Sequence, residues 1–175
     1  MAASLVAVDT NILIYLLGEG GDGQQQALAR RLFEVFRREG WSVALPTPVA
    51  AEYLSGALLG DPNPASVEKA MQVLSRRFVL LGFDARAVAV YARIMQMRAE
   101  GEVWRRVREE TGVPRRCLLA DIAILATAEA HGVPRLYSGE TKRRTLTRLA
   151  SAAGLRIQVQ YLDEAFPQPP LPYPT

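Results

Sequence analysis

Apolar residues occur along the chain in two patterns, which are short continuous runs and longer stretches with the period of a helix. The runs predict strands at 4–8, 43–45, 78–81, 136–137 and 157–159. The periodic stretches predict helices at 11–17, 24–38, 49–59, 65–75, 85–98, 118–130 and 141–152. Short apolar strands that alternate with helices are typical of a parallel sheet with helices on both faces. The sequence therefore predicts an α/β fold with a five-stranded parallel sheet.

The length of 175 residues suits one domain, which we assign to residues 1–166. Residues 167–175 form a Pro-rich tail that is expected to be extended. The arginine-rich segment 101–116 is interpreted as an inserted arm or flap. No apolar run approaches the roughly 18 residues of a membrane span, and no signal peptide pattern opens the chain. We therefore expect a cytoplasmic protein without a membrane partner.

Cysteine and histidine are too scarce for several kinds of chemistry. One cysteine excludes an internal disulfide, and one histidine beside it cannot complete a Cys/His zinc site. We interpret Cys117, next to two leucines, as a small core residue and His131 as a polar group at a helix end. Glycine-rich phosphate-binding loops are absent from the sequence, so dinucleotide and P-loop chemistry are not indicated.

Three acidic residues occupy positions where a carboxylate is costly. Asp9 directly follows the first predicted strand, and Glu52 and Asp121 are lone acids in apolar helical stretches. Each has a simpler explanation on its own, since Asp9 suits a helix cap and the other two can face water. In a parallel sheet, however, functional sites lie beyond the carboxyl ends of the strands. Together the three acids indicate a shared cation pocket, because a buried carboxylate needs a partner.

The sequence around each acid is similar to a motif of one known family. The motifs are Val8-Asp9-Thr10-Asn11-Ile12-Leu13-Ile14, Pro46-Thr47-Pro48-Val49-Ala50-Ala51-Glu52-Tyr53 and Leu119-Ala120-Asp121-Ile122-Ala123-Ile124-Leu125-Ala126-Thr127-Ala128. With these motifs in order, the chain resembles the PIN-domain nucleases, and particularly the VapC-type toxins of toxin–antitoxin modules. The resemblance extends from Val6 to Val159, which is the scale of one domain.

The fourth acid of the family is the weakest match. The family usually has a Ser/Thr-x-Asp pattern after the next strand, often followed by another acid. Here the sequence is Ser138-Gly139-Glu140, and Lys142 replaces the later acid. Glu140 therefore stands in for the fourth acid, but it is equally suited to be the N-terminal carboxylate of the following helix.

The resemblance implies that Mg²⁺ or Mn²⁺ supports hydrolysis of RNA phosphodiester bonds. Asp9 and Asp121 would be the principal metal ligands, with Glu52 and Glu140 completing the catalytic acidic ring. Thr10, Asn11 and Ser138 would orient these ligands or the attacking water. Oxygen ligands of this kind also suit hard divalent cations on chemical grounds.

The net charge of +3 is modest, but most of the basic residues are arginines, which can bind phosphate through two hydrogen bonds. Two basic clusters near the third and fourth motifs are candidates for RNA binding, although solvated helix faces explain them as well. Their members are Arg105, Arg106, Arg108, Arg115, Arg116, Lys142, Arg143 and Arg144.

The leading hypothesis is a metal-dependent ribonuclease that forms the toxin half of a toxin–antitoxin pair. The resemblance also implies a homodimer and a cognate antitoxin protein. One alternative is a PIN ribonuclease of RNA processing or quality control without an antitoxin. A second is a non-catalytic RNA- or protein-binding module, suggested by the weak fourth motif.

Overall fold

The computed structural model describes residues 4–18, 21–57, 63–96, 103–140 and 143–166. Five parallel strands form one sheet in the order β3-β2-β1-β4-β5. They are β1 (Leu5–Val8), β2 (Ser42–Pro46), β3 (Val79–Leu81), β4 (Arg135–Ser138) and β5 (Gln158–Tyr161). The predicted fold class is confirmed, because the sheet is wholly parallel and strands alternate with helices along the chain.

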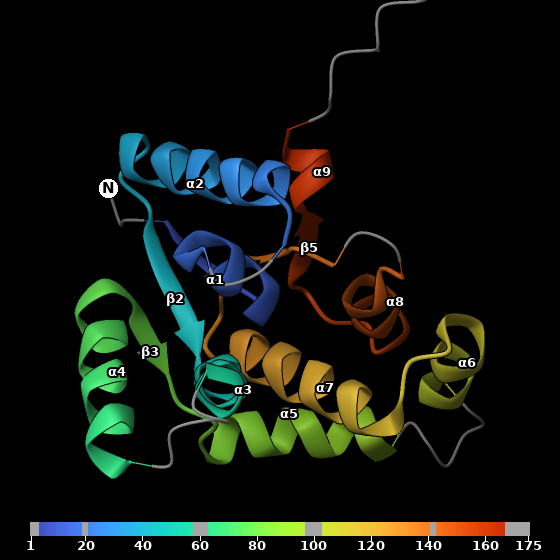
Figure 1. Cartoon of the computed structure of the whole chain (residues 1–175). Helices are drawn as coiled ribbons and strands as arrows, with labels where there is room; N and C mark the ends of the chain where they lie inside the picture. The colour runs from blue at the N-terminus through green and yellow to red at the C-terminus, as the bar shows by residue number, and fades with distance from the viewer. Residues whose placement is uncertain (1–3, 19–20, 58–62, 97–102, 141–142, 167–175) are drawn as a thin grey trace, which may run out of the picture.

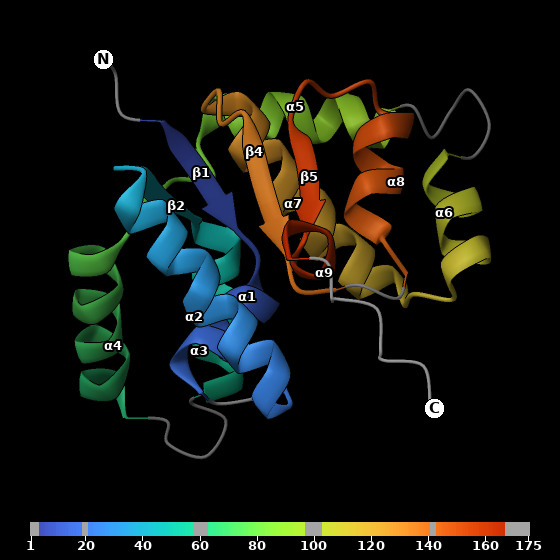
Figure 2. The same cartoon turned by 90° about the horizontal axis from the view of Figure 1, so that it is seen from above.

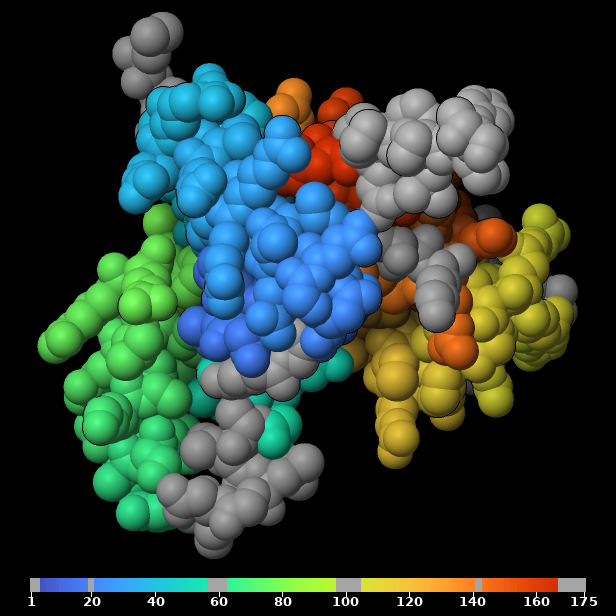
Figure 3. Space-filling model, turned by 45° about the horizontal axis from the view of Figure 1, so that its top comes forward, coloured from blue at the N-terminus to red at the C-terminus, as the bar shows by residue number. Residues whose placement is uncertain are grey.

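Helices cover both faces of this sheet. They are α1 (Thr10–Leu17), α2 (Gly23–Arg38), α3 (Thr47–Ala57), α4 (Pro64–Arg77), α5 (Ala85–Gln96), α6 (Val103–Thr111), α7 (Arg115–Ala130), α8 (Thr145–Ala152) and α9 (Leu162–Ala165). In Figures 1 and 2, α2 lies on one face of the sheet and α5 and α7 lie on the other. In Figure 2, α1 and α3 lie beyond the arrowheads of the strands. Figure 3 shows α2 at the centre of one surface, between α4 in green and α6 in yellow.

The central strand explains why the opening run of the sequence is continuously apolar. β1 pairs with β2 on one side and β4 on the other, and Val6, Ala7 and Val8 are all buried. A strand with helices on both faces has no solvent-facing side, so alternation with polar residues is not expected. Phe36 of α2 and Leu125 of α7 bury their side chains in the core as well. The first polar side chain after β1 is therefore placed at the edge of a well-packed core.

The helix predicted at 141–152 begins later than expected. α8 starts at Thr145, and Arg144 before it has left-handed backbone angles with φ of 52°. The guanidinium of Arg144 is paired with Asp163 and Glu164 near α9 and lies over the ring of Tyr161. These contacts to α9, a helix that was not predicted from the sequence, hold Arg144 outside α8. Lys142 lies outside the described residues.

The segment predicted as an arm or flap is folded against the domain where the structure describes it. Residues 103–111 form α6, which packs on α7 and α8. Val107 and Val113 are buried there, and Glu110 forms an ion pair with Arg148 of α8. The prediction of a core position for Cys117 was wrong, because this side chain is exposed in the first turn of α7. The predicted tail at 167–175 lies outside the described residues.

In the part of the chain that the structure describes, no helix is long and apolar enough to cross a membrane.

Candidate functional site

Asp9 is buried at the carboxyl end of β1 and caps the helix that follows. Its Oδ1 accepts a hydrogen bond of 2.9 Å from the backbone N–H of Ile12, and only 4% of its surface is exposed. The backbone N–H of Asp9 donates to the carbonyl of Tyr137 at 3.0 Å, which ties it to β4. The simpler interpretation of Asp9 as a helix cap is therefore correct.

Capping accounts for only part of the surroundings of Asp9. The hydroxyl of Ser138 donates to Oδ2 at 2.6 Å, and the backbone N–H of Gly139 lies 3.3 Å from both carboxylate oxygens. Burial raises the pKa of Asp9 to about 6, although these donors act to lower it. The pKa of Asp9 stays raised although several donors bind its carboxylate, so a nearby positive charge would further stabilise the ionised form.

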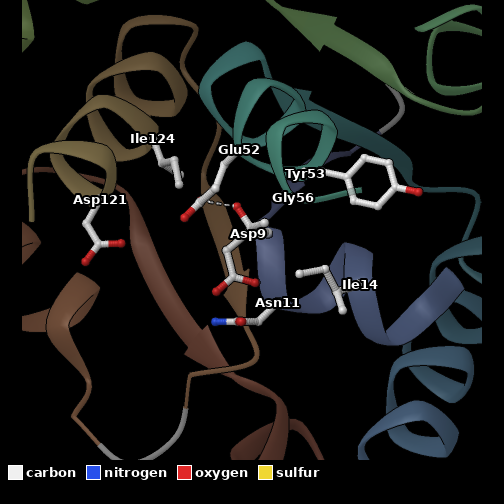
Figure 4. Close-up of a pocket in the computed structure, with 9 residues that line it drawn as sticks. Asp9, Asn11, Ile14, Glu52, Tyr53, Gly56, Asp121 and Ile124 are labelled. Atoms are coloured by element: carbon white, nitrogen blue, oxygen red, sulfur yellow. Dashed lines mark hydrogen bonds between the residues drawn. The ribbon is translucent and has the colours of Figure 1, made fainter. Parts of the chain in front are cut away.

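The side chains of Glu52 and Asp121 enter the same space as Asp9. The three acids come from α3, α7 and the β1–α1 junction, and they line one cavity of about 480 Å³ (Figure 4). The Thr10 hydroxyl donates to Glu52 Oε2 at 2.5 Å, which holds the glutamate beside Asp9. The rest of the lining is Thr10, Asn11, Ile14, Tyr53, Gly56 and Ile124. Three of the four predicted acids are therefore together.

The acids disturb one another electrostatically. The pKa of Asp121 is raised to about 8, first by burial and then by the negative charges of Asp9, Glu52 and Glu140. Like charges that share a cavity disfavour the ionised form of each member. A bound cation would reverse this effect, because it stabilises the ionised carboxylates.

Glu140 is placed differently from the other three. It is not among the described residues that line the cavity, and its carboxylate accepts hydrogen bonds from Arg143 N at 2.6 Å and Thr145 N at 3.4 Å. Thr145 N is the first backbone donor of α8, which the helix itself cannot satisfy, and Arg143 N lies in the turn just before the helix. Of the two interpretations drawn from the sequence, this geometry corresponds to the helix-terminal carboxylate. Glu140 still influences the cavity through its charge on Asp121.

The three polar residues expected to support the ligands lie next to them. Thr10 contacts Glu52, Ser138 contacts Asp9, and Asn11 lines the cavity below Asp9 in Figure 4. The sequence did not point to the backbone N–H of Gly139, because a main-chain donor has no residue signature. It also did not point to Tyr15, whose pKa is raised by burial and by the charges of Asp9, Asp22 and Glu140.

None of the described basic residues that were predicted to bind RNA lines the cavity. In the part of the chain that the structure describes, the cavity lining contains no arginine or lysine. Arg144 is held by Asp163 and Glu164, so its guanidinium links α8 to α9. The other described members are exposed, on α6, on the first turn of α7 and before α8: Arg105, Arg106, Arg108, Arg115, Arg116 and Arg143.

The oxygen atoms that line the cavity are the kind of ligand that hard divalent cations prefer. All side-chain donors are oxygens, and the mutual repulsion of the carboxylates would be relieved by positive charge. Within residues 4–166 as far as they are described, no three His, Cys, Asp or Glu side chains converge closely enough to hold one ion. An ion such as Mg²⁺ usually keeps several of its waters, so it can be bound with few direct protein ligands.

Comparisons with known proteins agree with the fold. A chain of the VapBC complex from Salmonella typhimurium bound to DNA aligns with a TM-score of 0.58 and 16% identity, covering 91% of this chain and 98% of that one. A chain of Rickettsia felis VapBC2, bound to a fragment of its promoter DNA, aligns at 0.55 with 16% identity and coverages of 90% and 98%. A chain of VapBC-1 from nontypeable Haemophilus influenzae aligns with a TM-score of 0.53 and 18% identity, covering 90% of this chain and 98% of that one. At these identities the likeness concerns the fold alone.

A search of curated protein sequences gave no match. The family model described as "PIN domain" matches residues 6–148, which include all four predicted acids, β2, β3 and β4, and β1 from its second residue. This match extends over most of the 175 residues. The chain therefore belongs to the PIN domain family.

Proposed function

We propose that the protein is an endoribonuclease that depends on a divalent cation, Mg²⁺ or Mn²⁺. The observation that carries this proposal is the convergence of Asp9, Glu52 and Asp121 from three separate elements on one cavity. Membership of the PIN family and the raised pKa values of Asp9 and Asp121 support it.

In this proposal Asp9 and Asp121 hold the cation, with Glu52 contributing either directly or through water. A bound divalent cation supplies an activated water and stabilises the negative charge of the scissile phosphate. Ser138 and the Gly139 N–H keep the Asp9 carboxylate oriented, and Thr10 does the same for Glu52. The Asn11 amide, which lines the cavity, would donate a hydrogen bond to a phosphate oxygen.

The first test is cleavage of RNA by the purified protein with Mg²⁺ or Mn²⁺. Asp9→Asn keeps the size of the side chain but removes its charge, so cleavage should fall by at least about a thousandfold. The matched control is Glu68→Gln, which neutralises an exposed acid on α4 outside the cavity and should leave cleavage unchanged. Equal activity in Asp9→Asn and wild type would contradict the proposal.

The structural neighbours suggest a biological setting. Solved structures with the same fold include VapBC complexes, so we propose that this chain has a small antitoxin partner. Expression of the chain alone should arrest growth, and co-expression of an adjacent small gene should relieve the arrest. Growth that is unaffected by active enzyme would instead favour RNA processing or quality control.

One observation favours a second candidate function. Glu140 accepts backbone hydrogen bonds at and just before the start of α8 and does not line the cavity, so among the described residues three of the four predicted acids line it. A non-catalytic PIN module that binds RNA is consistent with this smaller set of acids. RNA binding by the wild-type protein without any cleavage, at saturating Mn²⁺, would establish that alternative.

A further inference from the structure

Tyr15 of α1 lies between two glycines that come from separate loops. A Cβ atom placed on Gly21 would lie 2.7 Å from ring atoms Cδ1 and Cε1, and one placed on Gly139 would lie 2.7 Å from Cε2. Real Cβ atoms essentially never approach a neighbour so closely. The two edges of the ring therefore occupy space that exists only because both positions are glycine.

The two glycines are needed for different reasons. Gly21 has a left-handed backbone with φ of 75°, which by itself favours glycine. Gly139 lies outside the left-handed region, so its backbone would accept other residues. What excludes a side chain at Gly139 is contact, with the Tyr15 ring and with Asn11 Cβ at 2.9 Å. Gly139 thus marks a close approach of α1 to the loop after β4.

This close approach determines where the hydrogen-bond donors to the Asp9 carboxylate lie. The Gly139 N–H and the neighbouring Ser138 hydroxyl are the groups from the β4 end that donate hydrogen bonds to the Asp9 carboxylate. A shift of the loop of a few tenths of an ångström would weaken the N–H contacts, which at 3.3 Å are already long. The ring limits such a shift because it rests directly on Gly139.

We propose that Tyr15 is a positioning residue for Asp9, acting through Gly139. The ring edge sets where the loop of Ser138 and Gly139 lies, and this loop orients the carboxylate. Because the contacts are made by ring carbons, the hydroxyl of Tyr15 is not required. The consequence for cation binding rests on the proposed function of Asp9.

The test is a double-mutant cycle with Mn²⁺ affinity as the readout. Gly139→Ala should weaken Mn²⁺ binding about tenfold, as should Tyr15→Leu, whose side chain ends at Cδ and lacks the ring Cε atoms. The double variant should lose clearly less Mn²⁺ affinity than the product of the two single losses, since Tyr15→Leu removes the ring atom Cε2 that the new Cβ at position 139 would meet most closely. Tyr15→Phe keeps the ring and should bind Mn²⁺ like wild type.

The control is Gly82→Ala, because Gly82 is outside the cavity lining and a Cβ there would meet no atom within 4 Å. This variant should bind Mn²⁺ normally. The proposal is overturned if Gly139→Ala lowers Mn²⁺ affinity by the same factor in the wild-type and Tyr15→Leu backgrounds. It is also overturned if Tyr15→Leu lowers only the melting temperature and leaves Mn²⁺ affinity intact, which is the result expected of a merely structural residue.

A second readout separates this inference from the proposed function. If the wild-type protein binds no Mn²⁺, the proposed function fails, and hydrogen exchange of the Gly139 amide in the metal-free protein then decides about Tyr15. Exchange should be faster in Tyr15→Leu than in wild type and unchanged in Tyr15→Phe. Equal protection in all three proteins would overturn the positioning role.

Discussion

Asp121 illustrates how burial and like charge act together on one side chain. Its pKa is raised to about 8 from an ordinary value of 3.8, so the folded protein holds this proton more tightly than the unfolded chain does. As pH rises from about 4 to about 8, the unfolded chain releases the proton first. The stability that protonated Asp121 contributes to the metal-free protein is therefore lost progressively over this range and is fully present only below it.

Asp121→Asn removes the titrating group and should make stability less dependent on pH. In buffer with a chelator, the variant should melt at a higher temperature than wild type at pH 8 and at a similar temperature at pH 4. Each unit of pKa shift corresponds to about 1.4 kcal/mol, which sets the upper limit of the effect. Thermal melts at both pH values measure it, and a wild type that is equally stable at pH 5 and pH 8 would contradict the expectation.

Mn²⁺ should compensate for the same charges. At pH 8, added Mn²⁺ should raise the melting temperature of wild type more than that of Asp9→Asn, because an ion that binds only the folded state stabilises it. Calorimetric scans with and without the ion provide the comparison. Equal shifts in the two proteins would indicate that Mn²⁺ binds somewhere other than the acidic cavity.

Among the elements, the start of α8 shows most clearly where sequence patterns were insufficient. The run Lys142-Arg143-Arg144 is compatible with a helix, so an earlier start was predicted. The observed boundary depends on two contacts. Glu140 accepts hydrogen bonds from the backbone N–H groups of Arg143 and Thr145, and the guanidinium of Arg144 forms an ion pair with Glu164 of α9. Contacts between distant segments decide such a boundary, and local composition does not contain them.

Glu140 provides the prediction that belongs to this element. Glu140→Ala should cost about 1 kcal/mol through the lost cap and lower the melting temperature by about 2–4 °C. Glu140→Gln retains an oxygen acceptor and should keep most of both stability and RNA cleavage. If Glu140→Gln abolishes cleavage with an unchanged melting temperature, Glu140 acts as a true fourth acid of the site.

Other parts of the site followed directly from the sequence. Asp9, Glu52 and Asp121 were predicted together because Asp9 follows an apolar strand, the other two are lone acids within apolar helical stretches, and all three lie in motifs similar to those of one family. The role of Gly139 was not predictable, since its contacts to Tyr15 and Asp9 join residues far apart in the chain through ring edges and a backbone N–H. Cys117 was misplaced because its leucine neighbours suggested a buried position, whereas the buried side of α7 begins at Leu118.

For the whole molecule, the separation of charge sets the expected behaviour toward RNA. The cavity is lined by acids, while exposed arginines lie on α6 and at the start of α7. A polyanion must therefore be attracted by the surroundings of the site rather than by its centre. Such attraction depends on the release of counterions from the RNA and weakens as salt increases.

Replacing both Arg115 and Arg116 with Gln should weaken RNA binding and reduce the slope of log affinity against log salt by about one to two. The measurement is fluorescence anisotropy with single-stranded RNA in the Asp9→Asn background, which prevents cleavage. Arg38→Gln, on α2 at the other face of the sheet, serves as the control and should leave the slope unchanged. Identical slopes for both variants would argue against a role for the first turn of α7.

The exposed thiol of Cys117 makes the molecule easy to follow by spectroscopy. It is the one cysteine of the 175-residue sequence, so a nitroxide or fluorophore would attach at a single point without prior mutagenesis. Cys117 and Asp121 are four residues apart on α7 and therefore face the same side of the helix. A spin label there would sense paramagnetic Mn²⁺ arriving at the acids, and would report cation loading and partner capture in solution without any assay of cleavage.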